Sequence, residues 1–334
     1  MTPAPTQRIL SGIQPSGSQH IGHLVGALDN FTRLQDQGQA FYMIADWHAL
    51  TSKYESAEEI WPATQELTAT YLAAGLDPNQ ATIFVQSLVK EHAELHLLLS
   101  MVTPLSWLER VPTYKEKLQN AVADLGSYGF LGYPLLQTAD IIIYKALKVP
   151  VGEDQLFHLE LAREIVRRFN FIYQREVFPE PEAVLTKTPK VPGLDGKKMS
   201  KSYGNCIYLR DSNAAILEKC TRQMASDPAR LRKTDPGNPD ICPVFEFHKL
   251  FSDEATVGLV NTECRRAGIG CFDCKKRVAE AMIRRIEPVR DRIEAHLSHP
   301  KEIEAVLKDG SARARTVAAA TMVEVRDAMH LPTL

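Results

Sequence analysis

The chain has 334 residues, of which 44% are hydrophobic and 24% charged, a composition that excludes a largely disordered protein. Its 39 Lys and Arg against 41 Asp and Glu give a net charge of −2, so a uniformly basic nucleic-acid-binding surface is excluded and any RNA contact must use a local patch. The first ten residues lack the apolar core of a secretory signal, and no uncharged apolar run reaches the roughly 20 residues that span a bilayer. We therefore expect a cytoplasmic protein.

Short apolar segments that predict strands alternate with amphipathic segments that predict helices in the first half of the chain. The expected strands cover residues 8–13, 40–45, 82–85 and 149–151. The expected helices cover residues 21–34, 58–74, 91–102, 115–124, 133–148 and 155–170. Such alternation indicates βαβ units, so we predict an α/β fold built on a parallel sheet.

A stretch rich in proline and glycine between residues 178 and 198 indicates a domain boundary. Only helices are expected beyond it, at residues 214–224, 244–250, 254–267, 275–297 and 311–329. We predict a catalytic domain over residues 1–190, a helical domain over residues 191–310, and a C-terminal helix over residues 311–334 that packs back on the first domain.

The first candidate site lies where the first strand gives way to the first helix. There the chain reads Pro-Ser-Gly-Ser-Gln-His-Ile-Gly-His, which places His20 and His23 on one face of the first helical turn. Free backbone N–H groups at a helix N-terminus favour phosphate, and Gly22 would let a nucleotide approach the backbone. The dinucleotide fingerprint GxGxxG is absent from this turn, so a nicotinamide or flavin site is weakly supported.

The second candidate site is the segment Lys198–Ser202, which reads Lys-Met-Ser-Lys-Ser and is flanked by glycine and proline. Lysines on a mobile loop suit the charge that develops on a departing polyphosphate, because they can close over it late in the reaction. Either motif alone is most often a solvated surface feature. Their occurrence together, one at the first strand and one at the domain boundary, favours a nucleotide-handling site.

The pair of motifs resembles the HIGH and KMSKS signatures of the class I aminoacyl-tRNA synthetases. Within that class, the segments Ser11–Gly17, Ala139–Ile141 and Val149–Gln155 resemble the tryptophanyl-tRNA synthetases, and the resemblance runs from about residue 8 to residue 330. It implies a Rossmann-like catalytic domain followed by a helical anticodon-binding domain. It also implies two reactions, activation of L-tryptophan by ATP with Mg²⁺ to tryptophanyl-adenylate, and its transfer to tRNA(Trp), which release pyrophosphate and AMP.

The resemblance implies a role in catalysis for four residues, His20, His23, Lys198 and Lys201. A larger set is implied to contact ATP: Gln14, Pro15, Ser16, Gly22, His23, Gly152, Glu153, Asp154, Val191, Lys198, Met199, Ser200, Lys201 and Ser202. Within this set the lysines would cover the pyrophosphate, and the carboxylates would accept hydrogen bonds from the ribose hydroxyls.

For tryptophan, the resemblance implies that Asp140 accepts the indole N–H, which would reject phenylalanine because the buried carboxylate would then be unpaired. The remaining implied contacts are Tyr133, Gln155, Gln137, His48, Leu10 and Val151. The chain departs from common members of the family at Gln137, where an apolar residue is usual, and at Leu10, where an aromatic residue is usual. These departures concern the shape of the pocket rather than the reaction.

Four of the six cysteines fall in one segment with the spacing C-x21-C-x6-C-x2-C, at Cys242, Cys264, Cys271 and Cys274. Four thiolates can hold either Zn²⁺ or an iron–sulfur cluster. A minority of the tryptophanyl-tRNA synthetases carry a [4Fe–4S] cluster on nearly this spacing, so the resemblance favours the cluster over zinc and over unligated thiols. We expect it to be structural.

The segment around these cysteines is locally basic. Residues 265–292 hold nine Lys or Arg and four Asp or Glu, which suggests a contact with the tRNA backbone unless it is simply a solvated helix face. The resemblance further implies a homodimer formed through the catalytic domain, and neither a membrane nor DNA as partner. Two alternatives remain open: a tyrosine enzyme of the same class, and a HIGH-superfamily nucleotidyltransferase that ignores RNA.

Overall fold

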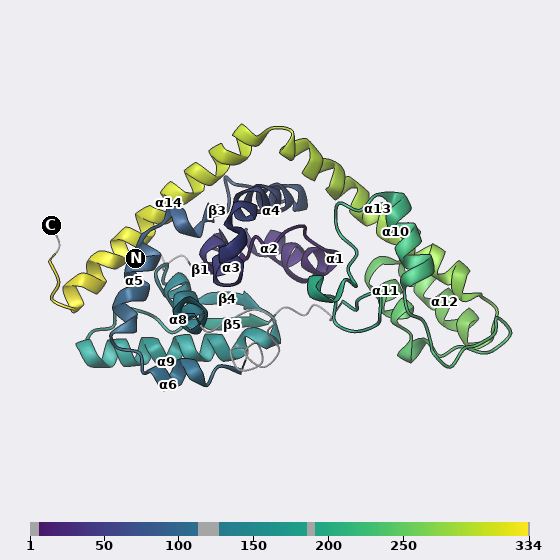
Figure 1. Ribbon diagram of the computed structural model, residues 1–334, viewed down its shortest axis with the longest axis horizontal. Coiled ribbons are helices and arrows are strands. Elements are labelled where there is room, and N and C mark those ends of the chain that lie inside the picture. Colours follow the sequence, from purple (N-terminus) through teal and green to yellow (C-terminus); the bar gives the residue numbers. More distant parts are fainter. Residues whose placement is uncertain (1–6, 113–126, 186–190, 333–334) are drawn as a thin grey trace, which may run out of the picture. The chain divides into compact units, whose positions relative to one another are not determined.

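The computed structural model of the chain describes residues 7–112, 127–185 and 191–332. Its centre is a five-stranded sheet in the order β3-β2-β1-β4-β5 (Figure 1). The strands are β1 (Arg8–Ile13), β2 (Gln39–Ile44), β3 (Thr82–Val85), β4 (Lys148–Val151) and β5 (Glu182–Leu185). Every neighbouring pair is parallel, so the predicted α/β fold is confirmed. The helix expected at residues 115–124 lies outside the described residues.

The sheet is buried at β2 and β3, where the strands carry continuous apolar runs. In β2 every residue after Gln39 is buried, and all four residues of β3 are buried. Parallel strands covered on both faces show such runs rather than alternation. The ring of Phe41 stacks on that of Tyr144 with 4.7 Å between centroids, and Phe84 meets the same tyrosine edge-on. The strand β5 was not predicted, because its residues are mostly exposed and follow two prolines.

The chain divides into two compact units. The first comprises residues up to 17, residues 30–187 and residues 299–334, and the second comprises residues 18–29 and 188–298. Around the sheet, the first unit holds α3 (Asp46–Lys53), α4 (Ile60–Ala74), α5 (Glu91–Ser100), α6 (Leu105–Glu109), α8 (Tyr128–Ile142), α9 (Leu156–Tyr173) and α14 (Pro300–Ala328), with most of α2 (Asp29–Leu34). The second unit holds α1 (Ile21–His23), α10 (Asn213–Glu218), α11 (Pro243–Phe251), α12 (Glu254–Arg265) and α13 (Cys271–Leu297).

Two helix boundaries differ from the expected ones for local reasons. The helix expected to reach residue 148 ends at Ile142, because Lys145 adopts a left-handed conformation with φ of 50° and the chain then enters β4. The last helix begins at Pro300, eleven residues before the expected start, and proline is favoured in the first turn because it has no N–H to leave unpaired. Between residues 21 and 34 the helix contains a π-helical turn at residues 24–28.

The long helix α14 covers the edge strand β3 (Figure 1). The Ser311 hydroxyl accepts a hydrogen bond from the Val85 backbone N–H at 3.3 Å. At Gly310 the two backbones approach so closely that an added Cβ would lie 1.8 Å from the Ile83 carbonyl oxygen. A covered edge cannot pair with another chain, so this contact protects the sheet from edge-to-edge association.

Gly310→Ala should destabilise the fold, because the added methyl group would force α14 away from β3. We expect a loss of about 1–3 kcal/mol in the free energy of unfolding, the usual cost of overpacking a tight contact. Urea denaturation measures it. In the matched control, Gly258→Ala in α12, the new Cβ meets nothing within 4 Å, so stability should hold or rise slightly. Equal denaturation midpoints for the two variants would contradict the close approach.

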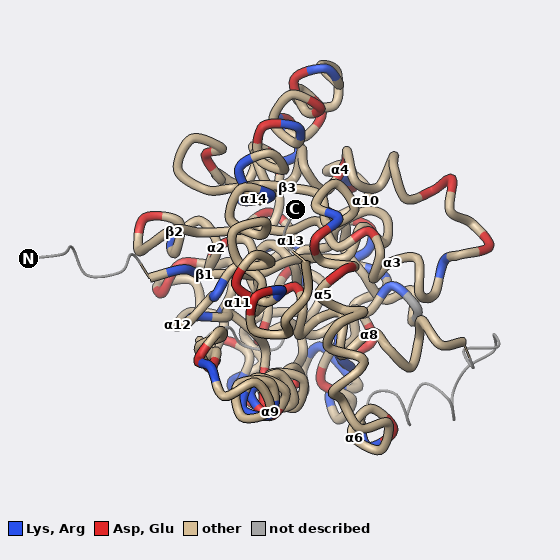
Figure 2. Tube along the Cα trace, turned by 90° about the vertical axis from the view of Figure 1, so that its left-hand side faces the viewer, with Lys and Arg blue, Asp and Glu red and all other residues tan. Residues whose placement is uncertain are grey.

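The charged residues of both signs are interspersed along the helices (Figure 2). Several join α14 to the rest of its unit, including Arg315 to Glu91 at 2.8 Å and Arg326 to Glu94 at 2.6 Å. Such exposed pairs contribute little each, so burial of the apolar face of α14 is what stabilises its position. Among the described helices, none combines the length and the apolar character that crossing a bilayer requires.

Candidate active site

The predicted polar residues of the first unit follow the carboxyl ends of its strands. Gln14 and Ser16 come after β1, His48 after β2, and the segment Gly152–Gln155 after β4. In parallel α/β sheets, ligands bind outside this edge. Gln14 and Ser16 are exposed and Pro15 is buried, while Gly17 turns the chain with φ of 95°, a conformation that favours glycine.

In the histidine turn, residues 20–23 of the second unit, the backbone N–H groups are already hydrogen-bonded within that unit. The Gly22 N–H donates to Nδ1 of His20 at 3.1 Å, and the His20 N–H donates to Nδ1 of His23 at 3.3 Å. The Ile21 and His23 N–H groups bond to the carbonyls of Ile207 and His20. The expectation of free N–H groups for phosphate is therefore wrong. Gly22 is required here because a Cβ would lie 2.9 Å from the His20 ring.

The two imidazoles of this turn are neutral at ordinary pH. They stack with 3.8 Å between ring centroids, and both are buried or nearly so. Burial, followed by the charge of Lys201, lowers the pKa of His20 to about 4. Burial, followed by the charges of His20 and Lys201, lowers the pKa of His23 well below its ordinary value. They therefore act as neutral hydrogen-bonding groups rather than as cations toward phosphate.

The lysine motif lies beside the histidine turn within the second unit. The chain directly after the motif pairs with the turn, because the Ile21 N–H donates to the Ile207 carbonyl at 3.0 Å and the Leu209 N–H donates to that of Gln19 at 2.8 Å. A Cβ on Gly22 would lie 3.9 Å from Sδ of Met199. Val191 and Met199 are buried, whereas Lys198 is exposed. The structure thus brings together the two motifs that are 175 residues apart in sequence.

Asn205, which sequence reasoning did not single out, shapes the lysine loop. Its side-chain oxygen accepts the Ser200 N–H at 2.8 Å, and its amide nitrogen donates to the Lys198 carbonyl at 3.1 Å and to Asp195 Oδ1 at 2.7 Å. The side chain is buried, with 4% exposure, and fills the space above Gly193, where a Cβ would lie 2.2 Å from it. The Asn205 side chain therefore fixes the backbone of the motif at both Lys198 and Ser200.

Asn205→Ala should lower the rate of any reaction that uses the lysine loop, while ligand binding to the first unit stays intact. Without the amide, the Lys198 carbonyl and the Ser200 N–H lose their shared partner, and a displacement of about 1 Å in a positioning element costs on the order of 100-fold in rate. Steady-state kcat and KM measure the effect. Asn79→Ala, at an exposed turn before β3, is the matched control and should behave as the wild type. An Asn205→Ala enzyme with undiminished kcat would show that the loop shape does not depend on this amide.

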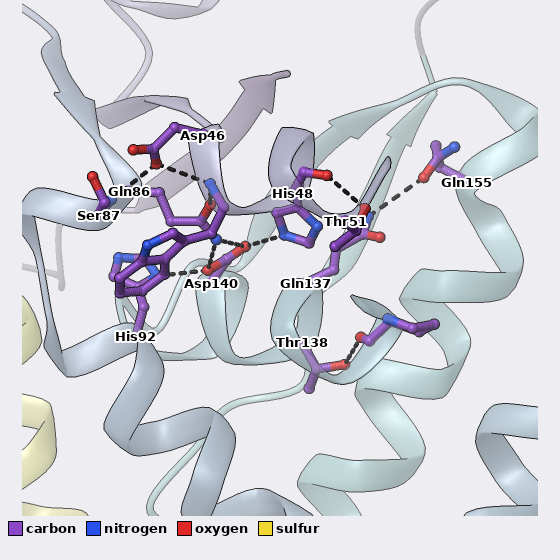
Figure 3. Close-up of polar contacts among 12 residues, drawn as sticks. Asp46, His48, Thr51, Gln86, Ser87, His92, Gln137, Thr138, Asp140 and Gln155 are labelled. Atoms are coloured by element: carbon purple, nitrogen blue, oxygen red, sulfur yellow. Dashed lines mark hydrogen bonds and ion pairs between the residues drawn. The ribbon is translucent and has the colours of Figure 1, made fainter. Parts of the chain in front are cut away.

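Asp140 on α8 is the centre of a buried hydrogen-bond network in the first unit (Figure 3). Its Oδ2 meets Nε2 of His48 at 2.7 Å, and its Oδ1 meets Nδ1 of His92 at 2.6 Å. The Gln86 amide nitrogen donates to both oxygens at 2.9 Å. Burial alone would raise the pKa of Asp140, but these hydrogen bonds and the charges of the two histidines hold it well below its usual range. The group is therefore an ionised, acceptor-only carboxylate.

The other residues expected at the tryptophan site lie on neighbouring elements of the same unit. Gln137 on α8 donates to the Gln155 side-chain oxygen at 3.4 Å. The Tyr133 hydroxyl meets Nε2 of His158 at 2.9 Å. Leu10 is buried in β1, where it belongs to the apolar core, and Val151 is half-buried in β4.

The segment after β4 that was expected to hold the ribose forms one tight turn. The Gln155 N–H bonds to the Gly152 carbonyl at 3.0 Å, and the Gln155 side chain donates to Asp154 at 3.3 Å. Glu153 and Asp154 are exposed. Oδ1 of Asp154 lies over Gly152, 2.7 Å from where a Cβ would be.

Comparison with known proteins matches residues 3–287 to the model of the family "tRNA synthetases class I (W and Y)". The chain belongs to this family. A protein of Thermotoga maritima named tryptophan–tRNA ligase is 53% identical over 97% of this chain and 99% of its own length. Another of that name from Ralstonia nicotianae is 43% identical over 97% of this chain and 98% of its own length. The solved tryptophanyl-tRNA synthetase of Campylobacter jejuni with ADP and tryptophan is 33% identical, with a TM-score of 0.88 over 97% of this chain and all of that one.

Sequence reasoning missed three members of the Asp140 network in this synthetase: Gln86, His92 and Tyr144. A signal for Gln86 existed, because it follows β3 at the same carboxyl edge that carries His48 and Gln14. His92 on α5 and Tyr144 in the turn after α8 belong to no distinguishing motif. Their role emerges only from the packing of α5 against α8.

The four cysteines of the synthetase all lie in the second unit near α11, α12 and α13. Burial, followed by the charges of Cys242, Cys264 and Cys271, raises the pKa of Cys274 to about 12. Sγ of Cys274 lies 3.5 Å from Nε2 of His248. Across residues 7–112, 127–185 and 191–332, however, no group of three or more His, Cys, Asp or Glu is arranged to hold a metal ion.

Proposed function

We propose that the chain is a tryptophan–tRNA ligase, which activates L-tryptophan with ATP and transfers it to tRNA(Trp). The observation that carries this conclusion is the relative of that name with 53% identity over nearly the whole of both chains. The buried acceptor Asp140 agrees with it, since a substrate ring that bears one N–H needs one acceptor. ATP with Mg²⁺ accompanies the reaction, because Mg²⁺ binds mainly through the nucleotide phosphates.

In the first step, a tryptophan carboxylate oxygen attacks the α-phosphorus of ATP, and the bond to the bridging oxygen breaks to release pyrophosphate. Lys198 and Lys201 stabilise the charge that moves to this leaving group, and neutral His20 and His23 bind oxygens of the nucleotide phosphates. In the second step, a hydroxyl of the tRNA 3′-terminal ribose takes the tryptophanyl group and AMP leaves. Gln14, Ser16, Glu153 and Asp154 are proposed to orient the nucleoside, and Tyr133 and Gln155 the substrate amino group.

ATP–pyrophosphate exchange with single amino acids tests the assignment. Exchange with tryptophan and not with tyrosine is expected. Exchange with tyrosine alone would identify the tyrosine enzyme of the same class. Brisk exchange without charging of any tRNA would identify a nucleotidyltransferase that ignores RNA.

We infer that Cys242, Cys264, Cys271 and Cys274 bind a [4Fe–4S] cluster, or else Zn²⁺. The support is their spacing, their common place beside α11, α12 and α13, and the absence of a side chain at Gly237, where a Cβ would lie 2.5 Å from Sγ of Cys264. When bound, the group would brace α11, α12 and α13. The residues of the chain hold it and no step of catalysis passes through it.

Anaerobic purification followed by iron, sulfide and zinc analysis tests the cysteine site. Cys271→Ser should lose the metal and lower the thermal midpoint. Cys220→Ala is the control, because Cys220 packs on Met282 with 3.7 Å between sulfurs, and it should keep the metal. Iron and sulfide in equal amounts indicate the cluster, zinc indicates the alternative, and neither element in the wild type refutes the proposal.

Contact with tRNA is proposed for part of the basic segment. Ion pairs already engage Arg265 with Asp240 and Arg285 with Asp29. Lys276 and Arg277 on α13 are exposed and are the candidates for backbone phosphates. Charge reversal at both residues should weaken tRNA charging and should make charging depend less on the salt concentration. The rate of ATP–pyrophosphate exchange should stay unchanged.

A homodimer is proposed through the first unit. Exposed apolar side chains occur at Leu97 on α5, Met101 directly after it, Leu105 on α6 and Tyr128 on α8, and α8 contacts both α5 and α6. Large exposed apolar side chains on adjoining elements are typical of interaction surfaces. Analytical ultracentrifugation of the wild type and of Met101→Glu tests this proposal. The wild type should sediment as a dimer and the variant as a monomer.

A further inference from the structure

The acceptor capacity of Asp140 is fully used in this structure. A carboxylate offers about four lone-pair positions, two on each oxygen. Oδ1 receives His92 and Gln86, and Oδ2 receives His48 and Gln86. A substrate ring N–H can therefore reach Asp140 only by taking the place of one of these donors.

Two of the three donors are anchored from behind. The Gln86 side-chain oxygen accepts the Trp47 backbone N–H at 3.1 Å, which turns its amide nitrogen toward Asp140. Nε2 of His92 meets the Tyr144 hydroxyl at 2.7 Å. Because the carboxylate only accepts, Nδ1 of His92 carries a proton toward it, and in the neutral form of the ring the Tyr144 hydroxyl donates to Nε2. Both Gln86 and His92 are 0% exposed.

The third donor, His48, differs from the other two in its surroundings. It stands near the start of α3, and 6% of its surface is exposed. It is therefore the donor that a ligand arriving from solvent meets, whereas His92 and Gln86 are fully buried. Figure 3 shows the side chains of all three pointing at Asp140.

We propose that His92 and Gln86 are positioning residues that set specificity for a ring N–H, by holding the Asp140 carboxylate in one orientation while the substrate N–H replaces His48 on Oδ2. This inference rests on the proposed tryptophan activation. It assigns Tyr144 a part as well, since its hydroxyl fixes the proton of His92 on the nitrogen that faces Asp140.

The experiment compares tryptophan with β-(3-benzothienyl)alanine, in which sulfur replaces the ring N–H, by ATP–pyrophosphate exchange. The wild type should favour tryptophan in kcat/KM by about 100-fold or more. His92→Leu and Gln86→Met each remove one donor, and the preference should fall by about 5-fold or more, at most to equal activity toward the two substrates, mainly through the KM for tryptophan. The KM for ATP should stay unchanged.

Two milder variants keep the test valid if His92→Leu folds poorly. His92→Asn retains a donor near the position of Nδ1 and should recover part of the preference. Tyr144→Phe removes only the hydroxyl, and the preference should fall because His92 is then free to carry its proton on Nε2. Gln80→Met, in an exposed turn, is the matched control and should keep the wild-type preference.

The outcomes separate this inference from the proposed function. A wild type without tryptophan-dependent exchange would refute the proposed function itself. A wild type that activates tryptophan, with Gln86→Met and Tyr144→Phe variants that lose activity toward both substrates equally, would overturn the inference, because a merely structural role leaves the preference unchanged.

Discussion

Asp140→Asn is expected to lower kcat/KM for tryptophan by about 100- to 10,000-fold, the largest loss among single substitutions in the first unit. Asparagine keeps the shape of the side chain but turns one acceptor oxygen into a donor. That donor then faces an imidazole N–H of His48 or His92, and the buried pair is left unsatisfied. The charge that strengthens the remaining hydrogen bonds is lost as well.

Exchange kinetics over a range of tryptophan concentrations measure the loss, which should appear with an unchanged KM for ATP. Asp77→Asn is the control, since Asp77 is a carboxylate in a turn whose partners are the nearby Asn79 and Gln80. If Asp140→Asn and Asp77→Asn enzymes activate tryptophan equally well, Asp140 does not recognise the substrate.

The parallel sheet was predictable because the short apolar runs at residues 8–13, 40–45 and 82–85 are typical of buried strands in a parallel sheet. Local pattern failed where a long-range contact decides the structure. The residues of β5 are mostly exposed, so their sequence resembles that of a loop. They form a strand because they pair with β4. The first turns of α14 carry one buried face at Ile303, Leu307 and Gly310, and Gly310 meets β3 so closely that only the fold reveals the contact.

In the candidate site, too, residues of short motifs could be predicted from sequence, whereas residues whose role depends on distant partners could not. The histidine and lysine motifs could be found in sequence because each is a short run of chemically distinctive residues. The mistake about the backbone N–H groups arose because an imidazole can cap its own turn, as His20 does, and sequence alone does not reveal the side-chain rotamer. His92 escaped notice because its function depends on Asp140 and Tyr144, which are about 50 residues away.

Lys198→Ala and Lys201→Ala are each expected to lower kcat for adenylate formation by about 100- to 1,000-fold, the usual loss when one charge-stabilising group is removed from a transition state. The pyrophosphate gains charge only as the bond to the α-phosphorus breaks, so the lysines act in the transition state more than in the bound substrate. The KM for tryptophan should therefore stay unchanged while kcat falls.

The neighbouring Lys197→Ala is a matched control, because Lys197 is an equally charged, exposed residue of the same loop outside the motif. It should keep the wild-type kcat, which separates the effect of position from that of net charge. Lys201→Ala has a second readout, since the charge of Lys201 helps to lower the pKa of His20 to about 4. An NMR titration should find that this pKa moves upward in Lys201→Ala and not in Lys197→Ala. If all three variants lose kcat alike, the loop contributes through its total charge, and the specific roles of Lys198 and Lys201 are wrong.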